Sequence, residues 1–343
     1  MATAASVGKQ RVPAPAWVWV LAALWLAAWI YQLIAGLGVT GLGQQVVWGG
    51  YIAGFFTAAG AGVGLVTAAA YSGGGRAARA TRTRLLTLAA SSFIAAGVLI
   101  TMDVGSPFTL WRLLVAFRFA SLMTWDAWLL AIVFVLTVVL LYRKPRRMAG
   151  LEWLTVALGV ALVAVEAWML SGEAARSLWT GGRTLVSFLV GAAIAGQGLA
   201  LLVDGYELRE RLRRGLAAML WLNLFLVVAE ALSGLIGGAP RTSAEALAIL
   251  GSGMFWLHLV VGMIVPLALV KGPAVRTAAA LAVLGVLLEK LWYLPAGQEQ
   301  PWLEGIPAAG YWPSLVEIIA LAGVAALAAL IYRYWSRSLL HAE

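Results

Sequence analysis

Long apolar segments separated by short polar ones make up almost the whole chain. Each apolar run has about 20 residues or more, the length that an α-helix needs to cross the hydrocarbon core of a bilayer. The runs are continuous rather than alternating, which favours helices over the strands of a barrel. The pattern predicts ten membrane spans, at residues 15–36, 47–71, 84–103, 124–142, 152–171, 184–204, 215–237, 246–270, 277–296 and 311–332. We therefore expect a single all-α polytopic membrane domain over residues 1–343, with the first span retained as an uncleaved helix.

Composition supports this class and excludes several others. Of the 343 residues, 62% are hydrophobic and 11% are charged, whereas soluble domains carry about 25% charged residues. The absence of cysteine excludes disulfides and Cys-ligated zinc or iron–sulfur centres within the chain. Of the two histidines only His258 lies in an apolar run, and a haem between membrane helices usually needs two axial ligands. We expect no haem, iron–sulfur cluster or other metal site in this chain.

Lysine and arginine are unequally divided between the two sides of the predicted bundle. Following the spans in turn, 18 of the 24 basic residues fall on the side that holds both termini. The other six are Arg112, Arg118, Arg176, Arg183, Arg241 and Lys290. The richer side is cytoplasmic by the positive-inside rule, so we expect a multi-pass protein of a bacterial or archaeal cytoplasmic membrane with both termini inside. The net charge of +9 then reflects topology rather than nucleic-acid binding.

The longest connection between two apolar runs, residues 103–128, lies on the outer side of this topology. A Gly-Ser-Pro break ends the preceding helix, and either Ser121 or Thr124 is placed to cap the next one. Residues 110–120 are expected to form a short helix at the membrane surface, with aromatic side chains in the headgroup layer and arginines reaching to water or phosphate. A plain interfacial loop with an aromatic belt explains the same residues.

Ionisable side chains within apolar spans are costly and are therefore candidates for function. They are Asp103, Asp126, Glu166, Glu230, His258, Glu289, Lys290 and Glu317. Most of them fall in the outer half of the predicted bundle, within about 10–15 Å of its surface. Glu166 and Glu230 are the best candidates for moving protons, because a buried carboxylate must be paired, protonated or in contact with water.

The other ionisable groups also have structural explanations. Lys290 can extend outward to the interface, and the helix N-terminus can stabilise Glu317. A lone His258 is more often a hydrogen-bonded packing residue than a catalytic one. Glu289 and Lys290 are adjacent on a helix and point in different directions, so separate partners are expected for them.

Glycines predict where the helices pack closely. The second span contains Gly54, Gly60, Gly62 and Gly64, and the sixth contains Gly191, Gly196 and Gly198. Both spans allow contact of the small-xxx-small kind. They run in the same direction and lie four spans apart, which indicates two four-helix bundles, spans two to five and six to nine, plus flanking helices.

Several segments together resemble the NrfD / polysulfide reductase membrane-subunit family. In chain order they are WGGYIAGFFTAAGAGVGL, DVGSPFTLWRLLVAFRFASLMTWDAWLL, LWTGGRTLVSFLVGAAIAGQGLAL, FWLHLVVGMIVPLAL, LEKLWYLPAGQ and YWPSLVEIIALAG. The resemblance covers nearly the whole chain. Near the end of the ninth span the sequence Glu289-Lys290-Leu291-Trp292-Tyr293 departs from the Arg-Tyr pattern expected there, which leaves the role of Lys290 open.

The resemblance implies a haem-free membrane subunit that binds quinone, either menaquinone or ubiquinone. Its implied partners are a periplasm-facing four-cluster iron–sulfur subunit and a molybdopterin catalytic subunit. Such a subunit exchanges two electrons and two protons between quinol and the nearest cluster, with or without proton translocation. Two alternatives stay open, a ten-span secondary transporter and a purely structural anchor. A transporter usually needs a midplane site at broken helices, and the sequence shows no pair of interrupted spans there.

Residue roles follow from the ionisable groups and the resemblance together. The candidates for binding the quinone head are Asp103, Asp126, His258, Tyr51, Tyr293, Trp111 and Trp125, the two tryptophans by packing on the ring. The candidates for proton transfer are Glu166, Glu230, Glu289 and Glu317. Arg112 and Arg118 are expected to meet the iron–sulfur partner.

Overall fold

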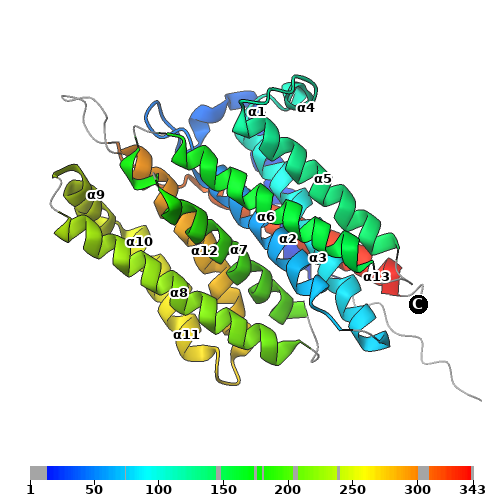
Figure 1. The fold of residues 1–343 in the computed structure, drawn as a ribbon. Helices are drawn as coiled ribbons and strands as arrows, with labels where there is room; N and C mark the ends of the chain where they lie inside the picture. Colours follow the sequence, from blue (N-terminus) through cyan, green and yellow to red (C-terminus); the bar gives the residue numbers. More distant parts are fainter. Residues whose placement is uncertain are drawn as a thin grey trace, which may run out of the picture.

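The chain folds into a layered bundle of long helices that run roughly side by side (Figure 1). The computed structural model describes residues 14–73, 75–143, 148–173, 176–179, 181–203, 208–237, 240–299 and 309–340, and these ranges contain no strand. The long helices are α1 (Ala16–Ala35), α2 (Gly50–Ala70), α3 (Arg76–Asp103), α5 (Leu122–Tyr142), α6 (Ala149–Ser171), α7 (Gly182–Val203), α8 (Arg209–Ile236), α12 (Val275–Glu299) and α13 (Leu315–Leu340). The predicted all-α membrane class is confirmed.

One predicted span is bent rather than continuous. Within the described residues nine helices are long and apolar enough to cross a membrane, and Thr242–Gly251 with Gly253–Leu269, which meet at 65°, can make a tenth. This region comprises α9 (Pro240–Gly251), α10 (Gly253–Leu257), a π-helix (His258–Ile264) and α11 (Val265–Leu269). The predicted number of spans agrees with this count, but the prediction of one uninterrupted span over 246–270 is wrong. The Gly-Ser-Gly sequence at the bend permits the turn, and the high average hydropathy of the region concealed it.

The spans form two four-helix bundles with two flanking helices, as predicted. Bundle 1 consists of α2, α3, α5 and α6, and bundle 2 of α7, α8, the α10–α11 segment and α12. The bundles meet mainly through α2 and α7, while α1 and α13 pack on each other beside α3. Bundle 1 carries the short helix α4 (Trp111–Val115) between its second and third spans, and α9 forms the first part of the bent span in bundle 2; both lie toward the same end of the long helices (Figure 1).

Glycine brings the two bundles into backbone contact. A Cβ atom on Gly64 of α2 would overlap the carbonyl oxygen of Ala192, and a Cβ atom on Gly196 of α7 would overlap the backbone of Gly64. Only glycine fits at either position without separating the helices. This contact confirms the close packing that the glycine pattern predicts for the second and sixth spans.

The segment between α3 and α5 is less helical than predicted. The helix expected over 110–120 is confined to α4, because the backbone leaves the helical region at Ala116 (φ −86°, ψ 61°). Ser121 begins the next helix, and its hydroxyl accepts a hydrogen bond from the N–H of Thr124 at 3.4 Å. Of the two predicted caps, Ser121 and Thr124, the structure therefore uses Ser121.

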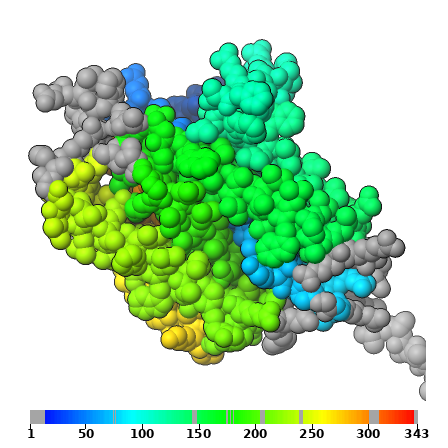
Figure 2. Space-filling view, in the orientation of Figure 1, coloured from blue at the N-terminus to red at the C-terminus, as the bar shows by residue number. Residues whose placement is uncertain are grey.

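This segment projects from the body of the molecule (Figure 2). Phe108, Val115 and Phe119 are 86%, 72% and 80% exposed. Exposed aromatic side chains beside exposed arginines are typical of a segment that lies at a membrane interface.

Candidate functional site

A cavity of about 420 Å³ lies in bundle 1 between α2, α3, α4 and α5. Its wall is mainly aromatic and aliphatic, and includes Trp48, Phe55, Phe56, Phe93 and Phe134. Exposed residues of the α4 segment line its mouth, so it is partly open to the surface. Volume and lining are typical of pockets that take small apolar molecules and orient them by a few polar groups.

Asp103 and Asp126 are the two ionisable side chains in this lining. Asp103 is the last residue of α3 and Asp126 lies near the start of α5. Because the end of α3 is joined to the start of α5 by the segment that contains α4, the fold brings both acids to the same end of bundle 1. One carboxylate oxygen of each, Oδ1, is buried without a hydrogen-bond partner. Buried polar atoms are normally paired, so both carboxyl groups have bonding capacity to offer a molecule in the cavity.

Of the other residues predicted to bind the quinone head, Trp111 lines the cavity, whereas Trp125 and Tyr51 do not. Trp111 of α4 lines the cavity mouth. Trp125 instead donates its indole N–H to the carbonyl of Phe119 at 3.0 Å and is not part of the lining. Tyr51 is fully buried behind the wall, where its hydroxyl donates to Gln32 Oε1 at 2.6 Å.

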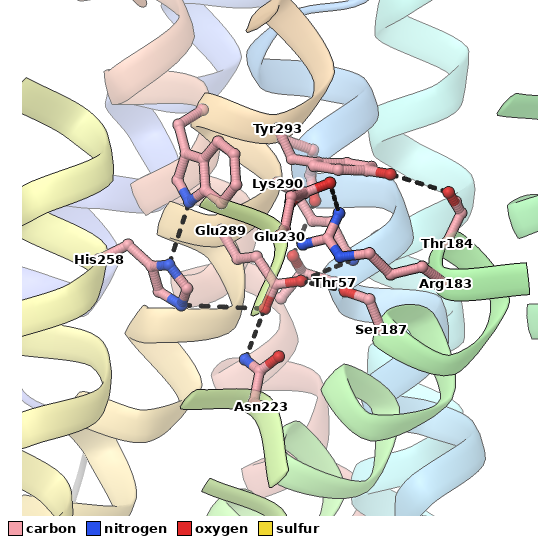
Figure 3. Close-up of polar contacts among 12 residues, drawn as sticks. Thr57, Arg183, Thr184, Ser187, Asn223, Glu230, His258, Glu289, Lys290 and Tyr293 are labelled. Atoms are coloured by element: carbon pink, nitrogen blue, oxygen red, sulfur yellow. Dashed lines mark hydrogen bonds and ion pairs between the residues drawn. The ribbon is translucent and has the colours of Figure 1, made fainter. Parts of the chain in front are cut away.

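A second group of polar side chains is buried in the middle of bundle 2 (Figure 3). Glu289 stands at its centre and is 2% exposed. Its Oε2 accepts a hydrogen bond from Asn223 Nδ2 at 2.8 Å, and its Oε1 accepts one from the hydroxyl of Ser187. His258 Nε2 lies 3.8 Å from the same Oε2. Four helical segments of bundle 2 thus meet at one carboxylate.

Lys290 is part of this group and not of the interface. It is 2% exposed, so the expectation that it extends outward is wrong. Its Nζ lies 3.4 Å from Glu289 Oε1 and 3.6 Å from the centre of the Phe188 ring. The expectation of separate partners for Glu289 and Lys290 is therefore also wrong. Two long, buried side chains reach each other even from adjacent positions, because a buried charge must be paired.

His258 and Tyr293 belong to bundle 2 and do not reach the cavity. His258 Nδ1 accepts the indole N–H of Trp292 at 3.0 Å, so a neutral ring carries its proton on Nε2, facing Glu289. The Tyr293 hydroxyl donates to the carbonyl of Leu178 at 3.0 Å and lies 2.8 Å from the hydroxyl of Thr184. The structure thus separates both residues from Asp103 and Asp126.

Glu230 has a cationic partner. Its carboxylate forms an ion pair with Arg183, which lies at the start of α7. The Arg183 guanidinium lies 5.4 Å from the centre of the Tyr293 ring. This ion pair extends the buried polar side chains of bundle 2 toward the end at which α7 begins.

Glu317 acts as a structural cap. Its Oε2 accepts hydrogen bonds from the N–H groups of Gly41 (2.7 Å) and Ser314 (2.9 Å), and its Oε1 accepts from Gly50 N–H (3.1 Å) and the Tyr311 hydroxyl (2.7 Å). Burial, with Glu317 beside it, raises the pKa of Tyr311, so its hydroxyl stays protonated as a donor. These bonds favour the structural explanation over proton transfer.

The sequence did not reveal the apolar wall or the neutral partners of Glu289. The wall residues Phe55 and Phe56 resemble dozens of other apolar residues, and nothing in the pattern marks them. Ser187 and Asn223 carry a weak signal, because polar side chains are rare in such spans.

The fold and the cavity define a polytopic helical membrane protein with an acid-bearing apolar site at one end of its first bundle. Residues 38–301 match the family described as "Polysulphide reductase, NrfD", and the chain belongs to this family. A protein of Halobacterium salinarum, named as a putative membrane subunit of dimethyl sulfoxide reductase, is 28% identical over an alignment that covers 92% of this chain and 88% of the relative. The resemblance noted in the sequence is confirmed.

Proposed function

We propose that this chain is the haem-free quinone-binding membrane subunit of an oxidoreductase complex, and that the cavity of bundle 1 holds the quinone head. The observation that carries this proposal is the pairing of an apolar cavity of about 420 Å³ with two acids that each keep an unpartnered oxygen. The name of the similar Halobacterium salinarum protein, a reductase membrane subunit, supports membership of such a complex.

The chemistry of a quinone matches this lining. A quinone has a flat apolar ring and two oxygens, and conversion of quinol to quinone releases two protons and two electrons. Asp103 and Asp126 provide two carboxylates that can accept hydrogen bonds and then protons, while the aromatic wall contacts the ring. The partly open mouth leaves room for an isoprenoid tail to extend into lipid.

The electrons need an acceptor outside this chain. The sequence contains no cysteine, so a cluster held by cysteines belongs to a partner. We place a four-cluster iron–sulfur subunit over the connection between α3 and α5 (residues 104–121), which contains α4. Arg112 and Arg118 are exposed there, beside the cavity mouth. A molybdopterin subunit would complete the complex and act on the terminal substrate.

The proposal includes an orientation of the protein in the membrane and a set of residues that carry protons. The outer end of bundle 1 faces the periplasm or the cell exterior, and both termini are cytoplasmic. The basic residues at 1–13 and 144–147 that support this orientation lie outside the described residues. Glu166, Glu230 and Glu289 are the proton carriers in this proposal, and Glu317, with its bonds already filled, is the weakest candidate.

One observation favours a transporter as the second candidate. The bend of 65° between α9 and α10 is the kind of broken helix at which transporters bind substrate. Bound quinone and co-purifying redox partners distinguish the two functions, because a transporter of this kind needs neither.

The test uses the intact complex purified from its native membrane. Asp126→Asn and Asp103→Asn should each lower quinol oxidation by about 100-fold, the usual contribution of a positioned proton acceptor, while all subunits still co-purify. Glu210→Gln is the matched control, since Glu210 is an exposed acid paired with Arg213. Wild-type turnover in both aspartate variants would contradict the site, and a wild-type chain that purifies without redox partners or quinone would contradict the function.

A further inference from the structure

Glu166 of α6 is an unusual residue in this structure. Its side chain is 0% exposed, and neither carboxyl oxygen has a hydrogen-bond partner. Glu289, Glu230 and Glu317, by contrast, each have defined partners. A buried carboxyl group with both oxygens unsatisfied is costly, which indicates a group kept for something other than packing.

Glu166 lies next to the cavity without lining it. Met169, one helical turn along α6 on the same face, is part of the cavity wall. Asp126 lies near the start of α5 and Glu166 near the end of α6, and because these two consecutive helices pack against each other in opposite directions, both acids lie toward the same end of bundle 1. The carboxyl group of Glu166 therefore lies behind the cavity wall at a depth similar to that of Asp126.

The helix α6 that carries Glu166 also packs against α7 of bundle 2. The cation of bundle 2 is Lys290, whose Nζ lies 3.4 Å from Glu289 Oε1. The cavity wall continues to this lysine through two rings. Phe56, which lines the cavity, packs edge-on against Phe188 with ring centres 5.1 Å apart, and Lys290 Nζ lies 3.6 Å from the Phe188 ring centre. Lys290 thus lies between the aromatic wall of the cavity and the Glu289 carboxylate.

We propose that Glu166 exchanges a proton with the cavity acid Asp126, and that Lys290, which lies between the cavity wall and Glu289, transmits the resulting change of charge to the polar side chains around Glu289 in bundle 2. This inference rests on the proposed quinone site and goes beyond it, because it names the step by which redox chemistry in one bundle alters the electrostatics of the other.

The step balances without a further reactant. When quinol is oxidised its two O–H bonds break, its two electrons would pass one at a time to the iron–sulfur partner, and the Asp126 and Asp103 carboxylates each take one of its two protons. Asp126 then gives its proton to the Glu166 carboxylate, directly or through one water, and is a carboxylate again. Neutralising Glu166 removes a negative charge behind the cavity wall, so the Lys290 ammonium group interacts more strongly with Glu289. Quinone reduction runs the same steps in reverse.

Redox-induced infrared difference spectroscopy on the intact complex tests this step, because it detects protonation of single carboxyl groups independently of turnover. Wild type should show a carboxylic acid band that appears when the quinone changes redox state. The band should vanish in Glu166→Gln and shift in Glu166→Asp. Quinol oxidation in Glu166→Gln should fall by about 100-fold, with bound quinone and KM unchanged and a larger solvent isotope effect.

Two further variants separate the relay from a structural role. Lys290→Arg keeps the positive charge beside Glu289 and should keep the carboxylic acid band, whereas Lys290→Met removes that charge and should shift the band. Glu152→Gln is the matched control, because Glu152 is also a buried acid of α6 but is paired with Arg82 at 3.0 Å. It should leave the band in place.

The outcomes distinguish this inference from the proposed function. If wild type oxidises quinol and Glu166→Gln retains both the band and the rate, the relay is overturned while the quinone site stands. If wild type neither binds nor oxidises quinol, the proposed function and the relay are both overturned.

Discussion

Filling the cavity from its own wall should block quinone binding without disturbing the fold. Gly97 of α3 lines the cavity, and a Cβ atom added to it would meet no other atom within 4 Å. The helix itself should tolerate the change, since replacing a glycine within a helix gains about 0.5–1 kcal/mol. Gly97→Phe therefore alters the space in the cavity and little else.

The expected size of the effect follows from volumes. A space on the order of 150 Å³ holds one benzene molecule, so a phenyl side chain removes about a third of the 420 Å³ in the cavity. Forcing a ligand into an overfilled site costs about 1–3 kcal/mol, which corresponds to roughly a 5- to 150-fold loss of affinity. Hydrophobic transfer from water adds nothing here, because the quinone comes from lipid.

The assay is quinol oxidation by the intact complex over a range of quinol concentrations, with inhibitor titration. Gly97→Phe should raise KM and the inhibitor constant by that factor, whereas Gly97→Ala should behave like wild type. Gly150→Phe is the matched control, since Gly150 also has open space around it but lies at the other end of the bundle, on α6. An unchanged KM in Gly97→Phe, with the protein folded, would refute the placement of the quinone in this cavity.

Three further predictions concern packing, capping and docking. Gly64→Leu should lower the free energy of unfolding of the detergent-solubilised protein by more than about 3 kcal/mol, because a Cβ atom at this position would overlap the backbone of α7. A melting curve like that of Gly150→Leu would contradict this prediction. Glu317→Gln should cost about 1–3 kcal/mol in thermal unfolding and leave the quinol KM unchanged; a raised KM with unchanged stability would instead assign Glu317 to the site. Replacing Arg112 and Arg118 together by alanine should weaken binding of the iron–sulfur subunit by about tenfold at low salt and less at high salt, and an unchanged dissociation constant would place the docking surface elsewhere.

The sequence was sufficient to predict that Asp103 and Asp126 lie near each other. Charged residues within apolar runs stand out, and two acids that flank one connection must lie at the same end of adjacent helices. The number of spans and the two-bundle arrangement followed from segment length and glycine spacing in the same way. Both kinds of evidence report depth in the membrane and order along the chain.

Depth and order do not say which bundle a side chain faces. The sequence groups His258 and Tyr293 with Asp103 and Asp126 because they carry suitable chemistry, yet the fold places them in bundle 2. Lys290 was expected to reach outward because isolated lysines in spans do so, but the neighbouring Glu289 offers it a buried partner at 3.4 Å. The apolar wall gave no signal at all, because in this chain most positions are apolar.

Photolabelling with a quinone analogue that carries a reactive group on its ring tests the central claim most directly. The purified complex would be irradiated with the analogue, digested and mapped by mass spectrometry, with native quinone as competitor. The account predicts competed labels on residues 93–134 and on the wall of α2 around Phe55 and Phe56, which border the cavity. Competed labels confined to the neighbours of His258 and Tyr293 in bundle 2 would contradict it.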